Sequence, residues 1–278
     1  LALDVCAFAI MSNHTHALLF VDKDQAMAWS LLEVVERWHR LFSGIPLSQR
    51  YLRGDGLLDA EMDRLLEIVE TWRERLMSVS WFMRCLNEHI ARLANAEDGC
   101  TGRFWEGRFK CQAILDEAAL AACMAYVDLN PIRAGIAQTP ESSDFTSIQR
   151  RIQALQSSTK QTKKEASQTQ PADLLPFVGN LREEMPKGLP FRLTDYLELV
   201  DWTGRIIRPD KRGAIPEGTP PILQRLNIER ESWQQLVTQF ESSLGALAGR
   251  ADSVQHACHI LGKQWSKGTS RCRALFAS

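Results

Sequence analysis

Two histidines two positions apart, His14 and His16, are the first residues whose types and spacing could do chemistry. They lie in the segment IMSNHTHALL, whose second half predicts a strand. Alternate residues of a strand point to one face, so both imidazoles can reach the same divalent metal. Two imidazoles are too few for a closed structural zinc site and suit an open one completed by another side chain, water and a phosphate. The alternative is a pair of polar residues at a strand edge.

A tyrosine in the segment AYVDLNPIRAGI is the candidate nucleophile. Tyr126 and Asn130 are four residues apart and share a face if the helix continues that far. Without further context, Tyr126 is a core residue with a satisfied hydroxyl. Asn130 before Pro131 is then an ordinary helix N-cap.

The segment GRFWEGRFK interleaves basic and aromatic residues. Arg103, Arg108 and Lys110 could contact phosphates, while Trp105 and its aromatic neighbours could stack on bases. A strand with an apolar inner face and a charged outer face explains the same pattern equally well.

Taken in order, MSNHTHALL, FMRCLNEHIARLAN, GRFWEGRFK and AYVDLNPIRAGI resemble the single-tyrosine HUH transposases, specifically the REP-associated tyrosine transposases. The resemblance covers about residues 3–137. It implies an α+β fold with a ferredoxin-like antiparallel sheet packed on helices. It also implies that His14 and His16 bind Mg²⁺ or Mn²⁺, that Asn130 completes the metal site, and that Tyr126 is the nucleophile. We expect Arg133, in the tyrosine segment, to contact DNA.

The implied substrate is single-stranded DNA, usually hairpin-forming, cleaved through a 5′-phosphotyrosine that a free 3′-OH can later displace. The chain departs from the family in three places. Thr15 stands where relatives carry a bulky apolar residue, and residues 44–77 look like a helical insertion. The family's preceding strand and helix are missing before Leu1, so we expect an incomplete sheet.

Several elements must position these residues. Apolar runs predict strands over 3–10, 16–21 and 103–114. Helical spacing predicts helices over 25–42, 59–76, 78–94, 116–128 and 144–156, and near 193–201, 229–244 and 251–265.

Composition divides the chain. Residues 157–173 are polar and predict a linker between a catalytic domain (1–156) and a mainly helical accessory domain (174–278). Residues 1–156 hold 16 Lys/Arg and 21 Asp/Glu, and residues 157–278 hold 17 and 13. The basic stretch at 200–213 of the second part could bind DNA phosphates or be an ordinary solvated loop.

Seven cysteines without a CxxC pair favour reduced thiols in a cytoplasmic protein. No apolar run is long enough to span a membrane. Two other functions stay open, a non-catalytic or domesticated hairpin DNA-binding protein and an HUH replication-initiator nuclease. The protein could act as a monomer or a homodimer.

Overall fold

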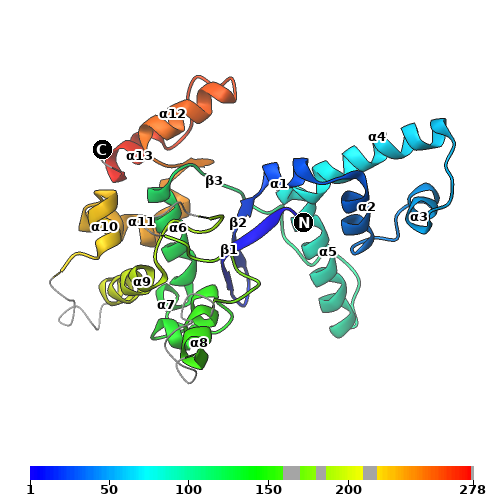
Figure 1. The fold of residues 1–278 in the computed structure, drawn as a ribbon. Helices are drawn as coiled ribbons and strands as arrows, with labels where there is room; N and C mark the ends of the chain where they lie inside the picture. The colour runs from blue at the N-terminus through cyan, green and yellow to red at the C-terminus, as the bar shows by residue number, and fades with distance from the viewer. Residues whose placement is uncertain (159–169, 180–185, 209–217, 277–278) are drawn as a thin grey trace. The chain divides into compact units, whose positions relative to one another are not determined.

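The computed structural model describes residues 1–158, 170–179, 186–208 and 218–276. Most of the predicted linker, and residues 209–213 of the predicted basic stretch, lie outside these ranges. The described part is a mixed α+β fold (Figure 1). It divides into two compact units, one made of residues 1–4 and 19–110 and the other of residues 5–18 and 111–278. This division differs from the predicted domains, because residues 174–278 share a unit with the predicted metal and tyrosine segments.

The predicted strands at the start of the chain are confirmed as β1 (Leu3–Ile10) and β2 (Thr15–Val21). They form a two-stranded antiparallel sheet. The Met11 N–H donates to the His14 carbonyl at 2.9 Å and closes the turn between them. His14 therefore lies at the end of the turn, and His16 lies within β2.

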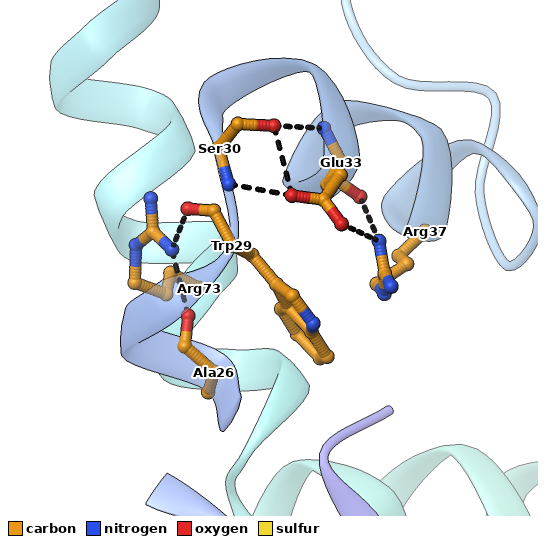
Figure 2. Close-up of polar contacts among 6 residues, drawn as sticks. All are labelled: Ala26, Trp29, Ser30, Glu33, Arg37 and Arg73. Atoms are coloured by element: carbon orange, nitrogen blue, oxygen red, sulfur yellow. Dashed lines mark hydrogen bonds and ion pairs between the residues drawn. The ribbon is translucent and has the colours of Figure 1, made fainter. Parts of the chain in front are cut away.

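Helices make up most of the first unit. They are α1 (Lys23–Ala28), α2 (Leu31–His39), α3 (Pro46–Arg53), α4 (Asp59–Leu76) and α5 (Val79–Glu97). The single helix predicted over 25–42 is wrong, because the chain breaks between α1 and α2. Ser30 accepts from the Glu33 N–H, and the Glu33 carboxylate accepts from the Ser30 N–H (Figure 2). This capping box starts a new helix at Leu31.

An arginine on α4 also stabilises the break between α1 and α2. Arg73 is buried and donates to the Ala26 carbonyl at 2.7 Å and the Trp29 carbonyl at 2.6 Å (Figure 2). These carbonyls belong to the end of α1, where a helix leaves backbone acceptors unpaired. The neighbouring residue Trp72 stacks on Trp38 of α2, with ring centroids 4.9 Å apart. Arg73 and this stack together fasten α1 and α2 to α4.

The predicted strand over 103–114 is wrong for most of its length. Residues 101–112 have no regular structure, and only Ala113–Ile114 forms a short strand, β3. The Trp105 side chain donates to the Asn87 carbonyl at 2.9 Å, and Arg103 donates to the Trp105 carbonyl at 2.8 Å. Local side-chain bonds therefore hold this segment in place of a strand ladder. β3 pairs in parallel with β4 (Leu247–Ala248).

The second unit holds the remaining helices. They are α6 (Glu117–Asp128), α7 (Asn130–Arg133), the 3₁₀ turn η1 (Pro140–Ser142), α8 (Ser147–Ser158), α9 (Leu193–Ile207), α10 (Pro221–Leu226), α11 (Arg230–Ser243), α12 (Ala251–Ile260) and α13 (Thr269–Leu275). One hydrophobic core joins β1, β2, α6, α9 and α11. Residues after the predicted linker thus help to form the core that surrounds the tyrosine helix.

A buried carboxylate ties α6 to its neighbours. Asp128 accepts hydrogen bonds from the Ser147 hydroxyl, from the Ile148 N–H at 3.0 Å and from the Tyr196 hydroxyl at 2.6 Å. The Ser147 hydroxyl also accepts from the Phe8 N–H of β1 at 2.9 Å. Asp128 thereby connects the end of α6 to β1, α8 and α9.

Among the described residues, no helix is both long enough and apolar enough to cross a membrane.

We expect Arg73→Met to lower the free energy of unfolding by about 2–6 kcal/mol, because two buried carbonyls lose their partner and each costs about 1–3 kcal/mol. Urea unfolding followed by tryptophan fluorescence measures the change. Arg64→Met on the same helix is the matched control, since Arg64 forms only an exposed ion pair with Glu67. Its expected cost is about 0–1 kcal/mol. Equal losses in both variants would contradict the role given to Arg73.

Burial raises the pKa of Asp128 above its ordinary value of 3.8, against the opposing effect of its hydrogen bonds and of Arg151. The folded state therefore holds the Asp128 proton more tightly than the unfolded chain does. Stability from this group is complete below about pH 4 and is lost as the pH rises through the folded-state pKa. The unfolding free energy of the wild type minus that of Asp128→Asn should then fall with rising pH and level off. Denaturation across this pH range measures the difference, and a rise with pH would show that the hydrogen bonds outweigh burial.

Candidate active site

The two histidines of the β1–β2 hairpin lie against each other. Their ring centroids are 4.9 Å apart and the rings are nearly perpendicular, at 84°. With metal–nitrogen bonds of about 2.1 Å, two imidazoles on one ion have centroids roughly 5 Å apart. The observed spacing is compatible with a shared metal ion.

In each histidine, the Nδ1 atom has an oxygen partner. The Nδ1 atom of His14 lies 2.6 Å from Oδ1 of Asn13, and Nδ1 of His16 lies 3.2 Å from Oε1 of Glu241. Neither Nε2 atom forms a hydrogen bond with another described residue. Burial lowers the pKa of His16, against the raising effect of Glu241, so that His16 is neutral at neutral pH. A neutral imidazole with a free nitrogen is the form that binds a metal.

The tyrosine at position 126 faces this pair. The ring of Tyr126, on α6, has its centroid 5.6 Å from that of His16 in an edge-on arrangement. On α11, the Phe240 ring lies 5.8 Å from the Tyr126 ring. Burial raises the pKa of the Tyr126 hydroxyl, so it keeps its proton at neutral pH. The structure thus brings together the predicted nucleophile and the predicted metal pair within the second unit.

A guanidinium covers the face of the tyrosine ring. The Cζ atom of Arg133, at the end of α7, lies 3.9 Å from the Tyr126 ring centroid. Its Nη1 donates to the Tyr126 carbonyl at 3.3 Å and to the Val237 carbonyl at 3.2 Å. This positive charge lowers the pKa of Tyr126 and partly offsets the effect of burial. The described contacts of Arg133 are to Tyr126 and to Val237, and contact with DNA stays a prediction.

The predicted third ligand is buried near the start of α7. Asn130 is 3% exposed, and its amide nitrogen has no hydrogen-bond partner among the described residues. Helix α6 ends at Asp128, so Asn130 begins the next helix instead of continuing the tyrosine helix. A buried donor without a partner is rare in a folded protein. The amide nitrogen cannot bind a cation, so a ligand role would fall to the amide oxygen and stays a prediction.

The donor set fits a divalent cation in an open site. In the part of the chain that the structure describes, no group of three or more His, Cys, Asp or Glu side chains is arranged to hold a metal. The structure brings His14 and His16 together. With the Asn130 amide, whose approach to them stays a prediction, they would offer two nitrogens and an oxygen and leave positions for water and phosphate. Such a set suits Mg²⁺ or Mn²⁺ completed by a substrate better than a closed zinc site.

The predicted DNA-contacting residues of the segment GRFWEGRFK belong to the first unit, whereas the histidine–tyrosine site belongs to the second. Arg103, Arg108 and Lys110 are exposed, and Trp105 is half-buried with Phe104 edge-on to it at 4.9 Å. Their exposed charges are available to phosphates.

Sequence reasoning missed Glu241. It lies far beyond the residues that resemble the transposases, on a helix whose local pattern indicates only an amphipathic surface. No motif marks it, and only the packing of α11 against α6 brings it to His16.

Comparison with protein-family models, with curated proteins and with solved structures found no match. The resemblance to the HUH transposases therefore rests on the motif residues and stays a prediction.

Proposed function

We propose that the protein is a metal-dependent tyrosine transposase that cleaves and rejoins single-stranded DNA through a 5′-phosphotyrosine intermediate. One observation carries the proposal. Residues 14, 16 and 126, from a hairpin and a distant helix, meet with ring centroids 4.9 and 5.6 Å apart. A tyrosine serving only as a core residue does not require two neighbouring imidazoles with free Nε2 atoms.

The nucleophile is the Tyr126 hydroxyl. Its oxygen attacks the phosphorus, the bond from phosphorus to the 3′-oxygen breaks, and the leaving oxygen becomes a 3′-OH. The covalent intermediate keeps the energy of the phosphodiester, so a second 3′-OH can rejoin the strand without ATP. Arg133 supports the step by stabilising negative charge on the phenol oxygen as its proton leaves.

His14, His16 and Asn130 would hold the metal ion. When bound, Mg²⁺ or Mn²⁺ polarises the scissile phosphate and offsets charge that develops during the displacement. The buried position of Tyr126 excludes water from its ring, while exposed His14 leaves the metal side open to a DNA strand.

The finer features of the proposal concern fold and substrate. We infer that the β1–β2 hairpin and α6 are the central part of a ferredoxin-like arrangement, since both carry the residues that the family places there. Arg103, Trp105, Arg108 and Lys110 are proposed to bind the single strand, by phosphate contacts and base stacking.

The decisive test is covalent capture of DNA. The full chain is incubated with a labelled single-stranded hairpin library and Mn²⁺, and the products are separated on a denaturing gel. We expect a protease-sensitive shifted band that disappears with Tyr126→Phe, with His14→Ala and on addition of EDTA. Each change removes either the attacking oxygen or the metal.

Tyr51→Phe is the matched control, because Tyr51 belongs to the first unit and should leave the band unchanged. A band that persists in Tyr126→Phe would overturn the assignment of the nucleophile. Hairpin binding by the wild type without any covalent band would favour the non-catalytic DNA-binding protein.

Arg133→Met tests whether Arg133 stabilises the negative charge on the Tyr126 oxygen. A cation over an aromatic ring contributes about 0.5–2 kcal/mol, which corresponds to a roughly 2–30-fold slower formation of the covalent band. Single-turnover rates at saturating DNA measure the effect. Arg150→Met, which removes an exposed arginine paired with Asp173, is the control and should leave the rate unchanged. Weaker DNA binding at an unchanged rate would assign Arg133 to the DNA instead.

A further inference from the structure

Glu241 lies in the last turn of α11, in the same unit as the candidate site. Its Oε1 is 3.2 Å from Nδ1 of His16, whose side chain is 15% exposed. Its negative charge also acts on Tyr126 and on Arg133. The carboxylate therefore belongs to the same cluster as the predicted nucleophile and metal pair, although it comes from the opposite end of the chain.

The backbone of α11 changes direction just before this residue. Gln239 has non-helical angles, φ −131° and ψ 27°, inside an otherwise helical segment. The next two residues are Phe240, which contacts the Tyr126 ring, and Glu241, which contacts His16. Irregular turns within helices often occur at functional sites because they redirect side chains.

The position of the carboxylate distinguishes a supporting role from direct ligation. Glu241 contacts Nδ1, the same nitrogen that Asn13 contacts on His14. In each ring, Nδ1 is therefore engaged by an oxygen atom, and Nε2 remains available to bind a metal ion. Metal-binding histidines usually donate their second N–H to a carboxylate or carbonyl oxygen, which fixes the tautomer and the ring orientation.

We propose that Glu241 is a positioning residue that accepts a hydrogen bond from Nδ1–H of His16 and so presents Nε2 to the metal ion. The inference rests on the proposed function, which supplies the metal. It makes α11, from beyond the predicted linker, an integral part of the metal site. The same helix supports the nucleophile through Phe240 and through the Val237 carbonyl that Arg133 contacts.

Metal affinity gives the first readout, independent of DNA cleavage. The full chain is titrated with Mn²⁺ alone and free Mn²⁺ is followed by electron paramagnetic resonance. Loss of an outer-shell partner of a metal-binding histidine costs about 10–100-fold in affinity, and we expect a weakening of this size for Glu241→Ala. Glu241→Gln, which keeps an acceptor oxygen, should lose less. Glu231→Gln on the same helix is the matched control and should bind as the wild type does.

The tautomer of His16 gives a second readout without metal. Long-range ¹⁵N–¹H correlation spectra of the imidazoles should show the proton of His16 on Nδ1 in the wild type and in Glu231→Gln. In Glu241→Ala the proton should move to Nε2 in a substantial fraction of molecules. Far-ultraviolet circular dichroism confirms that each variant is folded. A purely structural loss would not shift the tautomer of the His16 ring alone.

Unchanged Mn²⁺ affinity and an unchanged tautomer in Glu241→Ala would overturn this inference and leave the proposed function intact. A wild-type chain that binds no Mn²⁺ would overturn the metal site itself, and the role of Glu241 with it. The two failures are therefore distinguished by the wild-type titration.

Discussion

The hydrogen bond between the Ser147 hydroxyl and the buried Asp128 carboxylate is the constraint on which the candidate site depends. Ser147 also accepts from the Phe8 N–H of β1, and Asp128 lies two residues after Tyr126. One side-chain pair thus links the strand that leads to the histidines with the helix that carries the tyrosine. Because a buried polar group without a partner is costly, the two elements cannot separate without breaking several bonds at once.

The packing of helix α11 against the tyrosine helix α6 is the second constraint. Trp233, Leu236 and Val237 are fully buried in the core shared with α6 and α9. Their burial fixes the position of the helix, so the residues after the bend at Gln239 are carried to the site by packing and not by local preference. The segment beyond the predicted linker therefore shapes the environment of Tyr126, and the candidate site is not confined to the residues that resemble transposases.

Local signals predicted much of this arrangement, and their limits follow from physics. Apolar runs located β1 and β2, although His14 lies at the end of the turn and only His16 lies within β2. Helical spacing located α4, α5 and α6 within a few residues. The break before α2 had a readable signal, the Ser30–Glu33 capping box, which competes with a continuous apolar pattern over 25–42. The strand prediction was wrong for residues 103–112, because alternation of aromatic and charged residues also occurs where side chains form local hydrogen bonds. Glu241 had no sequence signal, since its role depends only on tertiary packing.

The charges around Tyr126 have a consequence for the order of binding. A phosphodiester is repelled by a carboxylate, and Glu241 lies 3.2 Å from His16, where the proposed substrate phosphate would bind. On the Nδ1 side of His16, however, its charge strengthens the imidazole as a donor to a cation, and the cation then attracts the phosphate. Arg133 adds a positive charge over the face of the Tyr126 ring. In the proposed mechanism, the site without metal would disfavour DNA at the histidine pair, and a bound cation would reverse this. Binding of the cation and binding of DNA would therefore be coupled.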